Sequence, residues 1–178
     1  MVLTSIPLLD ELLQHHASAL GADFGAYRNH TYRVVNFCSA LSTADPVALE
    51  KIAIAAAFHD LGIWTDKTFD YLPPSEGLAR AYLARKGNAE WAPEIRAMIH
   101  EHHKITRYHS NPNWLVEAFR RADLVDVSRG IITFGLSRQF RREVFSTFPN
   151  AGFHKRLVQL SLRRLVSHPL NPLPMYRL

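Results

Sequence analysis

A His-Asp pair at the end of an apolar segment is the strongest chemical signal in the sequence. His59 and Asp60 follow the run VALEKIAIAAAF, which is apolar nearly all round a helix. The C-terminal end of a helix carries unsatisfied carbonyl groups and the negative end of the helix dipole, so it favours a cation. An imidazole and a carboxylate at that end would give a divalent metal ion one nitrogen and one oxygen ligand.

Further ligands must come from other helices, because adjacent residues of a helix point about 100° apart. His30 lies in YRNHTYRVV, and Asp123 lies among apolar neighbours in RRADLVDVS, which places it inward. A buried carboxylate is costly unless it is paired or bound to a metal. Arg33, one turn from His30, could clamp a phosphate or form a salt bridge. Asp126, one turn after Asp123, could hydrogen-bond and orient a ligand histidine.

A second group of histidines lies in the segment MIHEHHK. His100 and His103 are three residues apart, so on one helix they would share a face. If that face points at the His-Asp pair, the two residues would bind a second ion or move a proton. In the alternative, they pair with glutamates on the surface. Lys104 follows in a loop that a substrate anion could reach.

Turn signals divide the chain into segments with helical periodicity, and no useful run alternates as a strand would. We therefore predict an all-α fold in which the apolar helix 46–60 is buried at the centre. Gly62 is expected to stop that helix, and residues 63–74 are expected to form a loop. The other predicted helices span 6–20, 23–41, 75–86, 91–103, 111–129, 137–147 and 152–167.

The length of 178 residues fits one domain, with a core at about 23–130, additional basic packing helices at 131–167 and an extended tail at 168–178. Residues 120–178 hold 11 Lys or Arg against 3 Asp or Glu, whereas residues 1–119 hold 10 against 13. This excess could attract nucleic acid. We favour solvated faces of amphipathic helices instead, because the arginines alternate with apolar residues at helical spacing.

The single cysteine, Cys38, excludes an intramolecular disulfide and lies in an apolar helical pattern, so it is expected to be a small buried residue. The first residues lack the basic region of a signal peptide, and no run of 18 apolar residues occurs. These features favour a cytoplasmic protein with no membrane partner.

Taken in order, HTYRV, HDLG, IHEHH and ADLVD resemble the motifs of the HD-domain superfamily of metal-dependent phosphohydrolases, over roughly residues 25–130. The resemblance implies that one divalent ion binds to His30, His59, Asp60 and Asp123. Members with two metals add further histidines, but no histidine lies between Asp60 and His100 here. One ion is therefore expected, with a second held more weakly, and the metal could be Mn, Fe, Zn, Ni, Co or Mg.

The resemblance predicts hydrolysis of a small phosphoester, which could be a nucleotide. In this mechanism the ion activates a water molecule, and Asp60, His100 or His103 accepts its proton. Arg33 and Lys104 would hold the phosphate oxygens. Two alternatives remain: a di-iron oxygenase of the same fold, and a non-catalytic module that binds a metal or a nucleotide. Iron content and oxygen consumption would identify the oxygenase.

Overall fold

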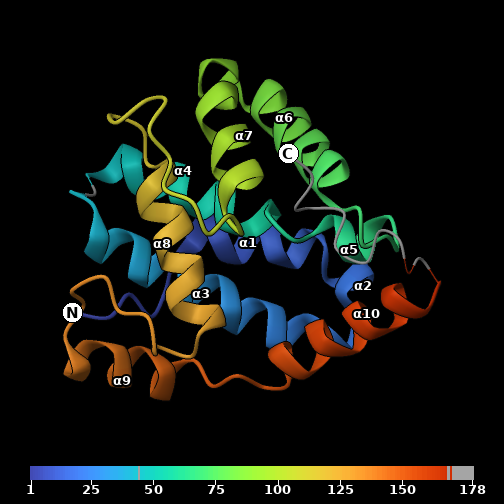
Figure 1. Cartoon of the computed structure of the whole chain (residues 1–178). Helices are drawn as coiled ribbons and strands as arrows, with labels where there is room; N and C mark the ends of the chain where they lie inside the picture. Colours follow the sequence, from blue (N-terminus) through green and yellow to red (C-terminus); the bar gives the residue numbers. More distant parts are fainter. Residues whose placement is uncertain (44, 168, 170–178) are drawn as a thin grey trace.

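The computed structural model describes residues 1–43, 45–167 and 169, and all regular secondary structure within these residues is helical (Figure 1). This confirms the predicted all-α fold class. The elements, in chain order, are α1 (Pro7–His15), α2 (Ala17–Leu20), the short 3-10 helix η1 (Gly21–Asp23), α3 (Phe24–Leu41), α4 (Pro46–Phe58), α5 (Gly62–Thr65), α6 (Leu72–Lys86), the 3-10 helix η2 (Ala89–Trp91), α7 (Ala92–Glu101), α8 (Val116–Val127), α9 (Arg138–Thr147) and α10 (Phe153–Ser167).

Helix α4 lies in the interior, as its composition predicts. Every residue from Ile52 to Phe58 is buried. Asp45 caps its start, where the side chain Oδ1 accepts a hydrogen bond from the backbone N–H of Ala48 at 2.7 Å, and Pro46 occupies the first turn. The capped first turn fixes where α4 begins, and its apolar surface on all sides buries the helix. The last turn of α4, and hence His59, therefore lies deep in the molecule.

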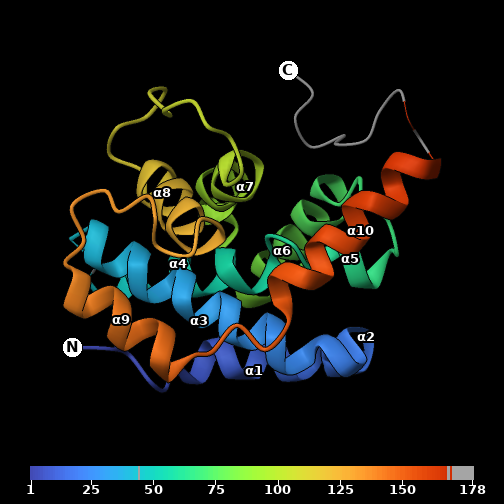
Figure 2. The ribbon, with the colours of Figure 1, turned by 60° about the horizontal axis from the view of Figure 1, so that its bottom comes forward.

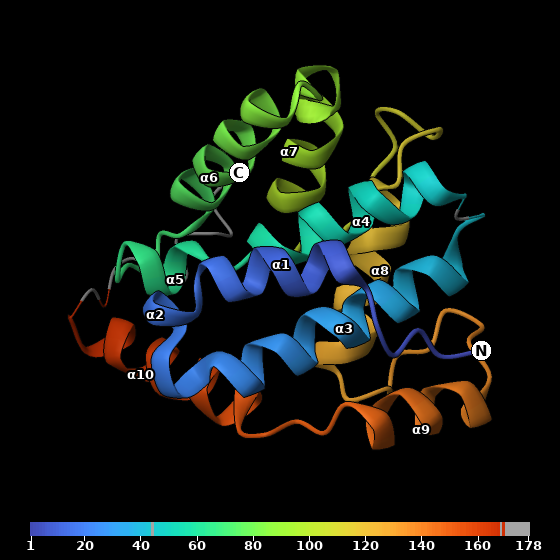
Figure 3. The ribbon, with the colours of Figure 1, turned by 180° about the vertical axis from the view of Figure 1, so that it is seen from behind.

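Three groups of helices surround α4. Helix α3 packs most extensively against α8 and also against α4, and α1 packs on α4 from the other side, as Figure 3 shows. Helices α6 and α7 form a pair that also contacts α4. The buried apolar side chains of these helices belong to one continuous core. This arrangement brings the middle of α3, the end of α4, the end of α7 and α8 to one point.

The basic C-terminal third forms two helices with nearly the predicted bounds. Ser137 caps α9 by accepting a hydrogen bond from the N–H of Phe140. Figure 2 shows α9 beside α3, and α10 running past α5. Only Phe153 of α10 is fully buried, and Leu157 and Leu160 are half-buried against the core. The predicted tail 168–178 lies outside the described residues, Pro169 excepted.

The segment after the His-Asp pair differs from the prediction. Gly62 does not end a helix but begins α5, and helix α6 starts at Leu72. Both ends of the predicted loop 63–74 are therefore helical, and only residues 66–71 lie between the two helices. A Cβ atom on Gly62 would lie 2.5 Å from the backbone oxygen of Tyr71. The glycine is therefore needed for close approach of two segments. Helix α8 also begins later than predicted, at Val116.

Cys38 is fully buried, as predicted, and burial raises the pKa of its thiol far above the usual range. Among the described helices, none combines the length and the apolar character that a membrane crossing requires.

Candidate metal centre

Four predicted ligands converge at the end of α4. His30 Nε2 lies 2.9 Å from His59 Nε2, and Asp60 Oδ2 lies 3.8 Å and 3.4 Å from these two nitrogens. Asp123 Oδ1 lies 3.7 Å from His30 Nε2 and 4.0 Å from His59 Nε2. All four residues are buried. His30, His59 and Asp60 thus form a buried cluster that could hold a metal ion.

A fifth residue, His102, joins this cluster. Its Nε2 lies 3.4 Å from Asp60 Oδ1, and the residue is only 3% exposed. Asp60 therefore lies between histidines, with Oδ2 facing His30 and His59 and with Oδ1 facing His102. The sequence placed His102 in a motif but gave no role to it.

Hydrogen bonds fix the same tautomer in all three histidines. The Nδ1 of His59 lies 2.8 Å from the carbonyl oxygen of Ala56, and the Nδ1 of His102 lies 2.6 Å from that of Ile99. A carbonyl oxygen can only accept, so each Nδ1 donates. The Nδ1 of His30 donates to Asp126 Oδ2 at 2.6 Å. Each neutral ring therefore keeps a lone pair on Nε2, and all three lone pairs face Asp60.

Two of the separations between these ligand atoms match the shell of one ion, whereas the other three, at 3.7–4.0 Å, are longer. Ligand nitrogens lie about 2.1 Å from a metal such as zinc. Two such nitrogens would lie about 3.0 Å apart at a right angle and about 3.4 Å apart at a tetrahedral angle. The separations of 2.9 Å between the His30 and His59 nitrogens and 3.4 Å between His59 and Asp60 fall at these values. Without a metal ion, two neutral Nε2 lone pairs would repel each other at 2.9 Å, so one of the two rings would have to carry a second proton.

The buried charges also require a cation. Asp60, Asp123 and Asp126 place three carboxylates in the interior, and Arg33 places one guanidinium beside them. With the three imidazoles neutral, as metal ligands must be, two negative charges are left without a buried counterpart in this group. Because uncompensated charge is costly to bury, a divalent cation would restore the balance.

The pKa shifts follow from the same charges. Burial lowers the pKa of His30 to about 4 and raises that of Asp123 to about 6. Burial also disfavours charge on His59, but Asp60 outweighs it and raises the pKa of His59 to about 9. Asp60 is buried too, yet His59 and His102 hold its pKa well below the usual range. The end of α4 thus attracts positive charge.

Asp126 orients the centre from behind, which confirms its predicted role. One oxygen accepts from His30, and burial of this carboxylate is outweighed by His30 and Arg33, which lower its pKa to about 2. Arg33 Nη2 donates to Asp126 Oδ2 at 2.9 Å, and Nε donates to the other oxygen. Arg33 Nη1 donates to the carbonyl of Phe148 at 3.0 Å. This fully buried arginine therefore takes the salt-bridge alternative, and no phosphate could reach it.

Aromatic rings close the centre, and the sequence did not reveal them. Phe153, the first residue of α10, stacks on the His30 ring with centroids 4.0 Å apart and planes 14° apart. Tyr27 stacks on the His59 ring at 6.2 Å, and its hydroxyl donates to the carbonyl of Ala57. The signal for Tyr27 was its spacing of three residues from His30. Phe153 is far from the motifs in sequence, so nothing local indicated it.

The other predicted catalytic residues have contacts of a different kind. Helix α7 ends at Glu101, with His102 as its C-cap. His100 Nδ1 lies 3.0 Å from Glu76 Oε1, which is the surface alternative, and its side chain is 44% exposed. The ring of His103 packs edge-on against His102 at 5.0 Å. Lys104 Nζ donates to Glu101 at 2.9 Å.

The segment after the His-Asp pair covers the His102 side of the cluster. The hydroxyl of Tyr71 lies 3.3 Å from His102 Nε2. Ser75 Oγ accepts from the N–H of Gly62 at 3.0 Å, and this buried bond joins the turn after Asp60 to α6. Close packing at Gly62 thus carries Tyr71 to the centre.

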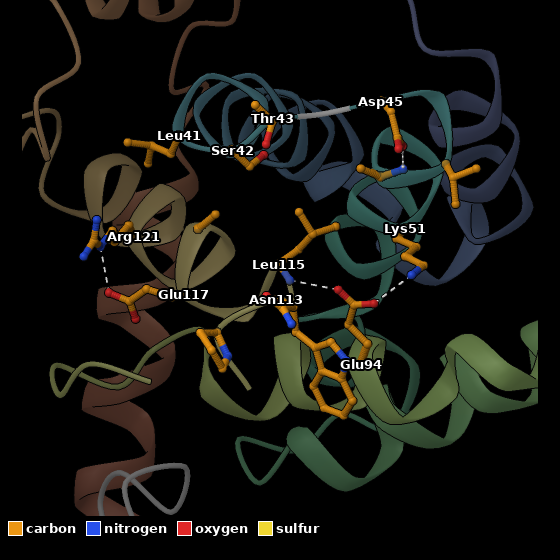
Figure 4. Close-up of a pocket in the computed structure, with 15 residues that line it drawn as sticks. Leu41, Ser42, Thr43, Asp45, Lys51, Glu94, Asn113, Leu115, Glu117 and Arg121 are labelled. Atoms are coloured by element: carbon orange, nitrogen blue, oxygen red, sulfur yellow. Dashed lines mark hydrogen bonds and ion pairs between the residues drawn. The ribbon is translucent and has the colours of Figure 1, made fainter. Parts of the chain in front are cut away.

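A cavity of about 590 Å³ lies at the opposite end of α4 (Figure 4). Helix α4 has 13 residues, about 20 Å of helix, so this cavity is remote from His59. Figure 4 shows its cations turned toward acids: Lys51 donates to Glu94 at 2.8 Å, and Arg121 donates to Glu117 at 2.7 Å. This cavity therefore presents a neutralised surface.

Comparison of the chain with protein-family models, with curated proteins and with solved structures gave no significant match. The interpretation of the centre therefore depends on its geometry.

Proposed function

We propose that the protein is a metal-dependent phosphohydrolase of the HD-domain type, acting on a small phosphoester. The observation that carries the proposal is the convergence of three Nε2 atoms and two carboxylates, where the buried charges sum to minus two when the imidazoles are neutral. His30, His59, Asp60 and Asp123 would hold one divalent ion. The ion would supply Lewis acidity and a lowered pKa for bound water.

The residues of the chain divide the remaining work. Asp126 and the carbonyls of Ala56 and Ile99 keep the three imidazoles in the tautomer that leaves Nε2 open. Asp60 Oδ1 and His102 Nε2, 3.4 Å apart, are the groups placed to accept a proton from attacking water. His102 thus replaces His100 and His103 in this role. Phe153 and Tyr27 exclude water from the back of the centre.

The change Asp60→Ala tests the metal site. We expect the wild-type protein, dialysed against Mn²⁺, Fe²⁺ or Zn²⁺ and then desalted, to retain about one equivalent of metal, and the variant to retain less than about a tenth of that, because an anionic ligand is lost. Asp66→Ala, an exposed carboxylate in the same segment, is the matched control. Elemental analysis measures the retained metal. Equal retention by Asp60→Ala and the wild-type protein would overturn the assignment.

The activity itself is tested with the metal-loaded protein on mononucleotides, cyclic nucleotides, dinucleotides and p-nitrophenyl phosphate. We expect release of phosphate or of a phosphomonoester by the wild-type protein and no release by Asp60→Ala. Absence of turnover on every ester, in protein with a full metal content, would contradict the proposal. Iron-dependent oxygen consumption would instead favour the oxygenase alternative.

A further inference from the structure

A second cavity, of about 650 Å³, lies between α10 and the segment that follows the His-Asp pair. Figure 2 shows α10 passing α5 at this place. We call this cavity the α10 groove. Its walls combine basic and aromatic side chains, which are Trp64, Lys67, Phe69, Arg156, Arg163 and Arg164. A volume of this size accommodates a small organic ligand.

The charge of the α10 groove is strongly unbalanced. Asp23 is the one carboxylate among the lining residues that the structure describes. Its Oδ2 is already engaged by Arg156 Nε and by Trp64 Nε1, each at 2.9 Å. Lys67 and Arg163 are exposed, and their side chains have no ion pair within the described part of the chain. The groove therefore offers cations to an anion from solution.

The cavity at the start of α4 provides an internal contrast. There, Lys51 and Arg121 each contact a glutamate within 2.8 Å. Both cations of that cavity thus have an acid of their own, whereas in the α10 groove Arg156 has one, through Nε, and Lys67 and Arg163 have none within the described residues. The α10 groove lacks such glutamates, although both surfaces belong to the same chain.

The spacing of the cations selects an extended ligand. Arg156 and Arg163 are seven residues apart on α10, which is about 10 Å along a helix. Lys67 comes from the opposite wall. Each guanidinium can donate two hydrogen bonds to the oxygens of one phosphate. A single small anion could not reach both arginines across this distance. A chain of phosphates would span it.

The aromatic wall accounts for the rest of the ligand. Phe69 is half-buried in the lining and leaves part of its ring exposed. Ile63 and Leu160 add apolar surface to the same cavity. Flat heteroaromatic rings stack on such side chains, as bases do in nucleic-acid complexes.

We propose that the α10 groove binds a nucleoside polyphosphate, with its phosphates along Arg156 and Arg163 and its base against Phe69. The groove is separate from the metal centre. The buried Tyr27 ring lies between them, 4.9 Å from Trp64 and 6.2 Å from His59. Binding in the groove is therefore independent of the metal ligands, and it does not require the proposed hydrolysis.

Calorimetric titration with ATP and, separately, with inorganic tripolyphosphate tests this proposal, in buffer with EDTA so that no metal bridges the phosphates. We expect both probes to bind the wild-type protein, ATP more tightly. The double change Lys67→Ala/Arg163→Ala should weaken both at least about tenfold. Arg138→Ala/Arg142→Ala removes the same charge from the exposed surface of α9 and should change either affinity less than about twofold.

Two further variants separate the possible outcomes. Phe69→Ala should weaken ATP but not tripolyphosphate, and Asp60→Ala should leave both affinities unchanged. The proposal is overturned if neither probe binds, or if the α9 control weakens binding as much as the groove variant does. Tripolyphosphate binding as tightly as ATP would overturn the nucleoside assignment. Loss of binding in Asp60→Ala would place the ligand at the metal centre instead.

Discussion

The metal centre and the α10 groove lie close together, yet their charged side chains differ in burial and in ion pairing. In the centre, Arg33 is fully buried, and its nitrogens donate to Asp126 and to main-chain carbonyls. In the groove, Lys67 and Arg163 face solvent without an ion pair in the described part of the chain. Arg33 is therefore committed to partners within the protein before any ligand arrives.

This difference separates the consequences of mutation. A buried charge that loses its partner keeps its desolvation cost, so the fold loses stability. An exposed charge costs little to keep or to remove, so its loss changes binding alone. Removing a charged side chain should therefore lower the free energy of unfolding when the residue lies in the metal centre. In the α10 groove, the same change should lower only the affinity for a ligand.

The largest effect is expected at Asp126. Replacing it with alanine leaves the buried Arg33 without its counter-ion and His30 without its Nδ1 acceptor. We expect the free energy of unfolding to fall by about 3–5 kcal/mol, the range for breaking a buried ion pair. Urea unfolding followed by circular dichroism measures this change. Asp126→Asn, which preserves the shape, should lose less but still more than about 1 kcal/mol.

The control for this prediction is Asp70→Ala, which removes an exposed carboxylate. It should change the free energy of unfolding by no more than about 0.5 kcal/mol. If Asp126→Ala unfolded at the same urea concentration as this control, the contrast between the two regions would be wrong.

A smaller effect should distinguish the histidines at the end of α7. His102 Nε2 faces Asp60, whereas His100 faces Glu76. We expect His102→Ala to raise the dissociation constant for Co²⁺ at least about tenfold, or about 1.4 kcal/mol, and His100→Ala to change it less than about twofold. Titration followed by the visible absorption of Co²⁺ measures both. Equal constants for the two variants would remove His102 from the centre.

Much of this centre could be predicted from sequence, because its residues sit in locally interpretable positions. Asp45-Pro46 marked the start of α4, the apolar run showed that α4 is buried, and His59 had to lie at its end. Asp123 sat among apolar residues in a helix, so it faced inward. Periodicity and capping are local properties, and they were sufficient for these assignments.

The errors arose where a long-range contact decides the outcome. Arg33 lies one turn from His30, but its partners include Phe148, which is 115 residues away. The choice of His102 over His100 depends on where α7 ends, and helix ends are poorly marked by periodicity. Gly62 looked like a helix stop, although its role is the close approach of Tyr71. None of these contacts leaves a pattern in nearby sequence.

The smallest effect concerns Glu117, whose burial is intermediate between that of the buried Arg33 and that of the exposed groove cations. It is half-buried and accepts hydrogen bonds from Arg120, Arg121 and the N–H of Tyr108. Burial alone would raise its pKa, but these donors outweigh burial and lower the pKa from 4.5 to about 2. A carboxyl whose pKa is lower in the folded state stabilises the fold above its unfolded pKa. This contribution is lost as the pH falls through the folded value.

Glu117→Gln should therefore be less stable than the wild-type protein at pH 6, and the difference should shrink as the pH falls from 4.5 toward 2, the interval between the two pKa values. Urea unfolding at pH 6, 4 and 2.5 measures the difference, in which the other titrating groups cancel. Glu50→Gln, an exposed glutamate on α4, should show no such trend. A difference that grows on acidification would mean that the arginines do not hold Glu117 in its ionised form.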